Sequence, residues 1–180
     1  TVTFKDGTTS LGVAALNSGV AKLSTTFTSV AVHSLTAVYA GSGTHSASTS
    51  AAVSETVTAI STSTGLTTNP TSTYVGQSVT LTATVSPSTA TGTVTFKDGT
   101  TTLGSVKLNA GSASLSKSFA TAGTHALTAV YAANGNYAAS TSAAVNEVVS
   151  ALTATATTLS ASTTTAYVGQ PIVLTAKVNQ

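Results

Sequence analysis

Apolar and hydroxyl-bearing side chains alternate residue by residue over several stretches of the chain. In one of them, single threonine residues separate Val79, Leu81, Ala83 and Val85. A period of two predicts a strand with one face in a core and the other in solvent. We expect further strands at 93–96, 102–108, 112–119, 124–132 and 137–149. No stretch has capped helical periodicity, so the sequence predicts an all-β fold.

Turn-forming residues separate these stretches. Asp98-Gly99 readily adopts the positive φ that tight hairpins need, and 109–111, 122–123 and 134–136 have similar turn chemistry. Seven short strands with a turn about every 8–12 residues are typical of an antiparallel, immunoglobulin-like β-sandwich. The serine- and threonine-rich runs at 58–68 and 153–165 are expected to form a first strand plus a linker.

The chain repeats itself. TVTFKDGTTSLG at 1–12 returns as TVTFKDGTTTLG at 93–104, displaced by 92 positions, and STYVGQSVTLTATV returns as TAYVGQPIVLTAKV, displaced by 93. Such periodicity indicates a tandem array. We therefore expect residues 58–149 to form a complete unit. Residues 1–57 are expected to be strands three to seven of a preceding unit, and residues 150–180 the first two strands of a following one.

The composition excludes several classes of protein. Only 6% of the residues are charged, against about 25% in a typical domain, while 41% are hydrophobic. Six Lys and four acidic residues give a net charge of +2, and the lysines do not cluster as nucleic-acid binding requires. Cysteine is absent, which excludes disulfides and thiolate metal sites. No membrane span or signal peptide is recognisable, so we expect an interior piece of a longer protein.

The order of motifs resembles a known family. Tyr74-Val-Gly-Gln77 is followed by VTLTATV, GTVTFKDGTTTLG and GTHALTAVYAANGNYAASTS. This series is similar to the bacterial immunoglobulin-like repeats found in tandem in large secreted and surface-anchored proteins. The resemblance implies a seven-stranded sandwich, an extracellular or cell-surface location, and a role as a stalk, spacer, filament or adhesin segment. It implies no catalytic residues.

The reactive side chains recur with the repeat. Asp98 matches Asp6, Glu147 matches Glu55, and His125 matches His33. A turn or core residue recurs in this way, whereas a catalytic group has no reason to. We interpret Asp98 as a turn residue and His125 as a partly buried imidazole bonded to nearby backbone. No catalytic, cofactor or metal site is expected, and the acids are too dispersed for calcium.

The most specific chemical alternative is an isopeptide crosslink within the domain. Lys97, Asn109 and Glu147 are all periodic, and an isopeptide bond joins a lysine to an asparagine or aspartate beside an acid. Both Lys97 and Asn109 lie at expected turns, which favours a purely structural interpretation.

The sequence therefore predicts a non-enzymatic structural module. Its expected partners are copies of itself, head to tail, or adjacent repeats of the same chain, with no nucleic acid and no membrane span. An adhesin that binds a glycan or host-matrix ligand is the alternative. For strand pairing between subunits, we expect a strand pair at 167–179 to complete the sandwich begun by residues 1–57 of the next copy. One apolar set should then face another: Ile172, Leu174, Ala176 and Val178 against Val2, Phe4, Leu23, Phe27 and Leu35.

Overall fold

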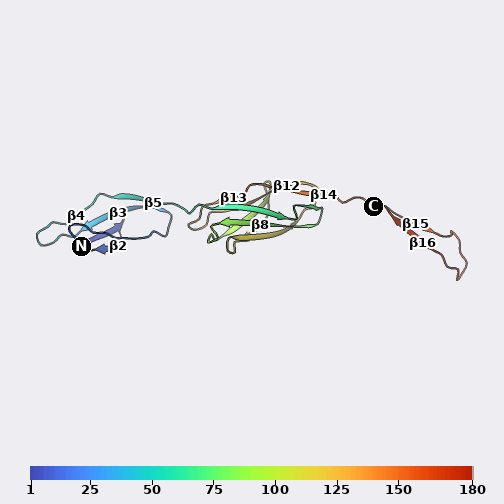
Figure 1. The fold of residues 1–180 in the computed structure, drawn as a ribbon, viewed down its shortest axis with the longest axis horizontal. Helices are drawn as coiled ribbons and strands as arrows, with labels where there is room; N and C mark the ends of the chain where they lie inside the picture. The colour runs from blue at the N-terminus through green and yellow to red at the C-terminus, as the bar shows by residue number, and fades with distance from the viewer. Residues whose placement is uncertain (180) are drawn as a thin grey trace.

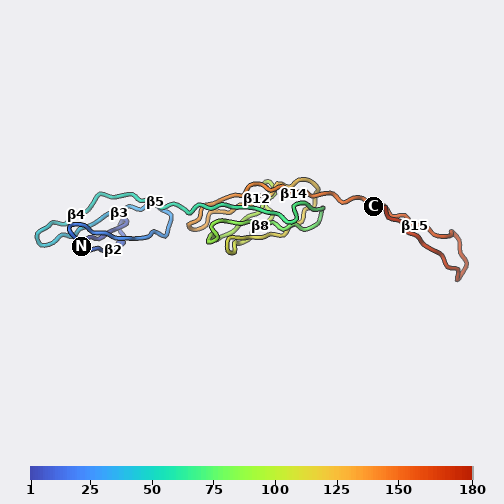
Figure 2. Tube along the Cα trace, viewed as in Figure 1, coloured from blue at the N-terminus to red at the C-terminus, as the bar shows by residue number. Residues whose placement is uncertain are grey.

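The computed structural model describes residues 1–179 as three bodies in a row (Figures 1 and 2). An N-terminal sheet is followed by a central two-sheet sandwich, and a two-stranded hairpin lies beyond it. Regular structure in the described residues consists of strands alone, as the alternating pattern predicts. None of residues 1–179 belongs to a helix long and apolar enough to cross a membrane.

The central sandwich contains nine strands in two sheets. The first sheet has the order β10-β9-β12-β14-β7, with the short β13 paired to β12, and the second has the order β11-β8-β6. Every pairing is antiparallel except that of β14 with β7. The strand bounds are β6 Ser63–Asn69, β7 Ser72–Tyr74, β8 Ser78–Ser86, β9 Thr93–Asp98, β10 Thr101–Lys107, β11 Ser112–Ser118, β12 Gly123–Tyr131, β13 Ser140–Thr141 and β14 Val145–Ser150.

The core of the sandwich lies between its two sheets. On β8 the inward residues Val79, Leu81 and Ala83 are fully buried, and their partners on β9 and β12 include Phe96 and Leu127. Further buried members of this core are Val85, Val94, Phe119, Ala129 and Tyr131, and Leu103 and Leu115 are partly buried against it. The hydroxyl residues between them point outward, so the Thr/Ser coat and the apolar core are two faces of the same strands.

One detail of the expected strands is wrong. The stretch 137–149 is not one strand, because the chain leaves the sheet between β13 and β14. The run at 58–68 contains a linker followed by a strand, as expected, and it pairs with β8 from Ser63 onward. A separate short strand, β7, crosses to the other sheet and was not expected.

The N-terminal sheet repeats half of this sandwich. It consists of β1, Val2–Asp6; β2, Thr9–Ala14; β3, Ala31–Tyr39; β4, Ser48–Thr49; and β5, Val53–Val57. Its register is that of the central sheet: Phe4 pairs with Ala37 on β3, as Phe96 pairs with Ala129 on β12. Residues 21–28, which correspond to β11 and the residues just after it, form no strand. The expectation of strands three to seven is wrong at that strand, because a strand needs a hydrogen-bonded neighbour and this unit has none.

The C-terminal hairpin repeats the missing pair. β15 (Thr157–Ala161) pairs with β16 (Leu174–Val178), and Leu159 lies opposite Ala176, as Leu66 lies opposite Ala83 in the sandwich. All residues of both strands are exposed. The expected pair at 167–179 is corrected accordingly: the first strand lies earlier, and Tyr167–Val173 lie in the loop between the two strands.

Hydrogen bonds join the linker and the N-terminal unit to the sandwich. The Ile60 backbone N–H donates to the Asn136 carbonyl at 2.7 Å, and the Ala138 N–H donates to the Ile60 carbonyl at 2.9 Å. The Asn136 side-chain amide also donates to the carbonyl of Thr28 at 2.8 Å. The joint between the two bodies is therefore a bonded contact as well as a covalent linker.

Candidate functional site

The inner face of the N-terminal sheet is open and apolar. It contains a hollow of about 280 Å³, lined by Phe4 on β1, Leu11 on β2, Leu35 on β3 and Val53 on β5, with Leu23 from the unpaired segment at its side. In the central sandwich the corresponding face is covered by β8 and β6. The hollow thus corresponds to the space in which, in the central sandwich, the side chains of the second sheet pack.

The same residue types differ in burial between the two units. Phe96 and Leu127 are 0% exposed in the sandwich, whereas Phe4 and Leu35 in the N-terminal sheet are only half-buried. The sequences around them are nearly identical. The difference therefore comes from the missing second sheet and leaves apolar surface in water, which is unfavourable.

The C-terminal hairpin exposes a matching apolar face. Leu159, Leu174 and Val178 are 69%, 60% and 53% exposed, and Ile172, just before β16, is 47% exposed. Leu174, Ala176 and Val178 share one face by alternation. Their counterparts in the sandwich, Leu81, Ala83 and Val85, are at most 3% exposed. The hairpin thus presents the surface that covers a core in the central unit.

Only some of the five N-terminal residues that we expected to face the C-terminal strands lie around one hollow. Phe4, Leu23 and Leu35 line one hollow. Val2 lies on the same strand but faces a second depression at the far end of the sheet, beside Tyr39. Phe27 instead stacks on His33, with ring centroids 3.9 Å apart. How the two apolar sets interact between subunits stays a prediction.

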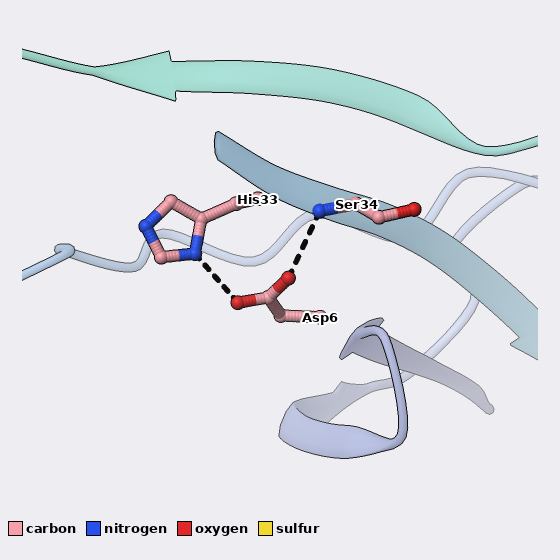
Figure 3. Close-up of polar contacts among 3 residues, drawn as sticks. All are labelled: Asp6, His33 and Ser34. Carbon is pink, nitrogen blue, oxygen red and sulfur yellow. Dashed lines mark hydrogen bonds and ion pairs between the residues drawn. The ribbon is translucent and has the colours of Figure 1, made fainter. Parts of the chain in front are cut away.

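Each unit contains a histidine–aspartate pair, at the end of β1 in the N-terminal sheet and at the end of β9 in the sandwich. His33 Nδ1 lies 2.6 Å from Asp6 Oδ2, and the Ser34 backbone N–H donates to the other carboxylate oxygen at 3.0 Å (Figure 3). In the sandwich, His125 Nδ1 lies 2.5 Å from Asp98 Oδ2. The expected turn position of Asp98 does not indicate these pairs, because the pairing depends on which strands are neighbours.

Each pair shifts the pKa of one of its partners. The hydrogen bond from His33 holds the pKa of Asp6 below its ordinary value, against an opposing effect of burial and with help from the Ser34 N–H. The bond to Asp98 raises the pKa of His125; burial opposes this, and the Thr121 carbonyl, 3.2 Å from Nε2, adds to it. The expected backbone partner of His125 is present, but the carboxylate has the larger effect.

This geometry serves packing rather than nucleophilic catalysis. A histidine that acts as a general base needs a ring nitrogen free to take a proton from a nucleophile. In the sandwich both ring nitrogens of His125 have partners, and its ring packs on Phe119 with centroids 4.3 Å apart. In the N-terminal unit, Nε2 of His33 has no hydrogen-bond partner, but it is buried and therefore closed to a nucleophile from solvent. The pair ties the β9 turn to β12 and the β1 turn to β3.

Glu147 is buried in the sandwich core. It lies opposite His125 in the β12–β14 register, is 0% exposed, and neither carboxylate oxygen has a hydrogen-bond partner. The alternation Val145-Glu147-Val149 is the signal that could have placed it on the inner face. Its counterpart Glu55 is exposed, which is another mark of the uncovered N-terminal unit.

The three residues considered for an isopeptide bond, Lys97, Asn109 and Glu147, do not lie together. Lys97 alternates with the buried Phe96 and so faces away from the core that holds Glu147, and Asn109 lies in the turn that bonds to Ser112. These positions do not suit an isopeptide crosslink. Among residues 1–179, no three His, Cys, Asp or Glu side chains lie close enough together to hold a metal ion.

These features define an immunoglobulin-like β-sandwich protein, with two facing sheets and an apolar interior. A sequence profile for the bacterial Ig-like domain (group 3) matches residues 1–58 and 66–150, and the chain belongs to this family. Domains of this kind are typical of extracellular or surface proteins and are generally non-catalytic. No curated protein matches the sequence.

Among solved structures, the chain is similar to the fibronectin(III)-like modules of Clostridium thermocellum CbhA. The identity is 19%, with 83% of this chain and 77% of that chain covered and a TM-score of 0.42.

Proposed function

We propose that the protein is a non-enzymatic structural module of an extracellular or cell-surface array, in which incomplete sandwiches are completed head to tail by strands of a neighbouring copy. One observation carries the proposal: the open apolar face of the N-terminal sheet and the exposed apolar face of β15–β16 correspond to the two halves of the central sandwich. Completion would remove both apolar surfaces from water.

The surface chemistry supports a passive mechanical role. The outer side of β8 and β11 consists of hydroxyl residues, some bonded across the strands, such as Ser78 to Ser116 at 2.6 Å and Thr82 to Ser114 at 3.1 Å. Such a surface has little to titrate, and without cysteine or methionine it has little to oxidise. These properties suit a spacer exposed to the medium.

A pair of substitutions on β16 tests completion. Leu174→Asp places a charge on the apolar face and should abolish self-association, because a buried unpaired carboxylate is strongly unfavourable. Thr175→Asp puts the same charge on the opposite face and should leave association nearly unchanged. Sedimentation and electron microscopy of the full chain measure both.

Deletion of residues 165–180 is a second test. Filaments should disappear, and the N-terminal sheet should stay poorly protected in hydrogen exchange at every protein concentration. Continued assembly of the deleted chain, or equal effects of the two aspartate substitutions, would contradict the proposal.

An adhesin is the second candidate, since the loop at 41–45 differs in sequence from its counterpart at 133–137. The loop of the sandwich, however, is engaged at the joint through Asn136, which disfavours a free binding surface there. Glycan and matrix-protein arrays probed with the full chain separate the two functions. Saturable binding that is lost when loop 41–45 is replaced by the 133–137 sequence would favour the adhesin.

A further inference from the structure

We propose that β15 and β16 of a second copy bind the N-terminal sheet in one defined register, with Leu174 opposite Leu23. The inference rests on the head-to-tail completion proposed above and adds the docking strand and its alignment. The segment 20–26, of which residues 21–26 belong to no strand, becomes the strand that receives β16.

The register follows from the central sandwich. There β8 pairs with β11 so that Leu81 lies opposite Leu115 and Ala83 opposite Ala113. Transfer by the displacements of 93 and 92 residues places Leu174 opposite Leu23, and Ala176 opposite Ala21. Both inward pairs keep the residue types of the sandwich. A shift by one residue would turn the apolar face of β16 to solvent.

The hollow has the chemistry to receive this face. Leu23, Leu11 and Phe4 surround it, and in the proposed register Leu174 lies beside Leu23 and covers the hollow from the second sheet. β15 follows as the outer strand, because Leu159 lies opposite Ala176 and so on the same face. The occupant is an apolar two-stranded hairpin, and the second copy supplies one.

The Gly19 backbone carbonyl, next to segment 20–26, is positioned to accept a hydrogen bond from β16. In the sandwich, the Val85 N–H donates to the Gly111 carbonyl at 2.7 Å, and a Cβ on Gly111 would lie only 2.8 Å from the Val85 carbonyl oxygen. Gly19 occupies the same turn, with φ of 81° against 78°, and has nothing within 4 Å of its Cβ position. In the docked register the Val178 N–H donates to the Gly19 carbonyl.

The partner is a different copy because of where the two surfaces lie. Figure 1 shows the N-terminal sheet at one end of the chain and β15–β16 at the other, with the sandwich between them. Each copy then offers one acceptor face and one donor hairpin. A head-to-tail contact of this kind does not close on itself and builds an open chain of copies.

Disulfide mapping tests the register, since the protein has no cysteine of its own. Ser24 and Val173 become direct neighbours on the outer face. Full chains carrying Ser24→Cys are mixed with full chains carrying Val173→Cys and oxidised, and a disulfide-linked pair of chains is expected. The matched control partner is Lys177→Cys, four residues further along the strand and thus about 13 Å away, beyond the roughly 7 Å that a disulfide spans.

Ser24→Cys should crosslink with Val173→Cys at least about tenfold faster than with Lys177→Cys, because the first two cysteines lie closer together. Equal or reversed rates would overturn the register. Sedimentation of the unsubstituted chain distinguishes the two levels of failure. If that chain associates but only the control pair crosslinks, head-to-tail completion stands and the alignment is wrong. If it stays monomeric and neither pair crosslinks, both proposals fail.

Discussion

The inward residues of β8 and β12 hold the central sandwich together. Leu81 and Leu127 are each 0% exposed. Leu81→Ala or Leu127→Ala should therefore destabilise the sandwich by about 2–5 kcal/mol, because the substitution loses the transfer free energy of the removed atoms and also leaves a cavity. Chemical unfolding of the full chain measures the loss. The matched change Thr82→Ala, on the outer face of β8, should cost far less. A near-neutral effect at both leucines would mean that the sheet faces are assigned wrongly.

The histidine–aspartate pair makes the stability of the sandwich depend on pH. The bond to Asp98 raises the pKa of His125, above the value of about 6.5 that the unfolded chain has. The stabilisation is therefore complete below about pH 6.5 and is lost as the pH rises through the higher folded value. Melting of the sandwich should become easier across that window.

Asp98→Asn should remove this slope, whereas Asp6→Asn, the matching change in the N-terminal sheet, should leave the melting of the sandwich as it was. Melting curves of the full chain from pH 5 to 9 provide the measurement. An unchanged slope in Asp98→Asn would show that another group is responsible.

At the residue scale, the sequence predicted what depends on alternation and missed what depends on neighbours. Val79 and Phe96 could be assigned to the core from the period of two alone. The contact of His125 with Asp98 joins two strands whose adjacency no local pattern encodes. Glu147 was missed for a different reason: an acid on an inner face contradicts the usual rule that charges stay in water.

At the scale of elements, a strand exists only where it has a partner. Residues 112–118 and 20–26 have closely similar patterns, yet only the first forms a strand, β11, because β8 lies beside it. The sequence predicted both, since periodicity reports the potential to pair and not the presence of the neighbour. The same reasoning explains why β15–β16 keeps its register in isolation while its faces stay exposed.

The turn between β10 and β11 should tolerate no side chain at its glycine. Gly111 has a φ of 78°, and a Cβ there would lie 2.8 Å from backbone atoms of Ser88 and Val85. Gly111→Ala should therefore cost more than about 1 kcal/mol. Gly99→Ala is the control, because its φ is 54° but nothing lies within 4 Å. Chemical unfolding compares the two variants, and equal losses would mean that the close approach is relieved without cost.

At the scale of the whole molecule, stability should be independent of calcium. Among residues 1–179 no cluster of acids forms a multidentate site, and calcium needs six to eight oxygen ligands. Millimolar calcium and EDTA should give the same melting curve for the full chain. A rise of several degrees on adding calcium would contradict this.

The joint between the N-terminal sheet and the sandwich should limit how far the two bodies bend relative to each other. Asn136 takes part in this joint twice: its backbone carbonyl accepts from the Ile60 N–H, and its side-chain amide donates to the Thr28 carbonyl. Asn136→Ala removes only the side-chain bond, so the angle between the two bodies should vary more while the melting of the sandwich stays the same. The control is Asn146→Ala, an exposed asparagine on β14. Small-angle X-ray scattering, or distances between spin labels on the two bodies, should show a broader distribution for Asn136→Ala alone. If the two variants have the same distribution, the linker itself sets the stiffness and the bond to Thr28 contributes nothing to it.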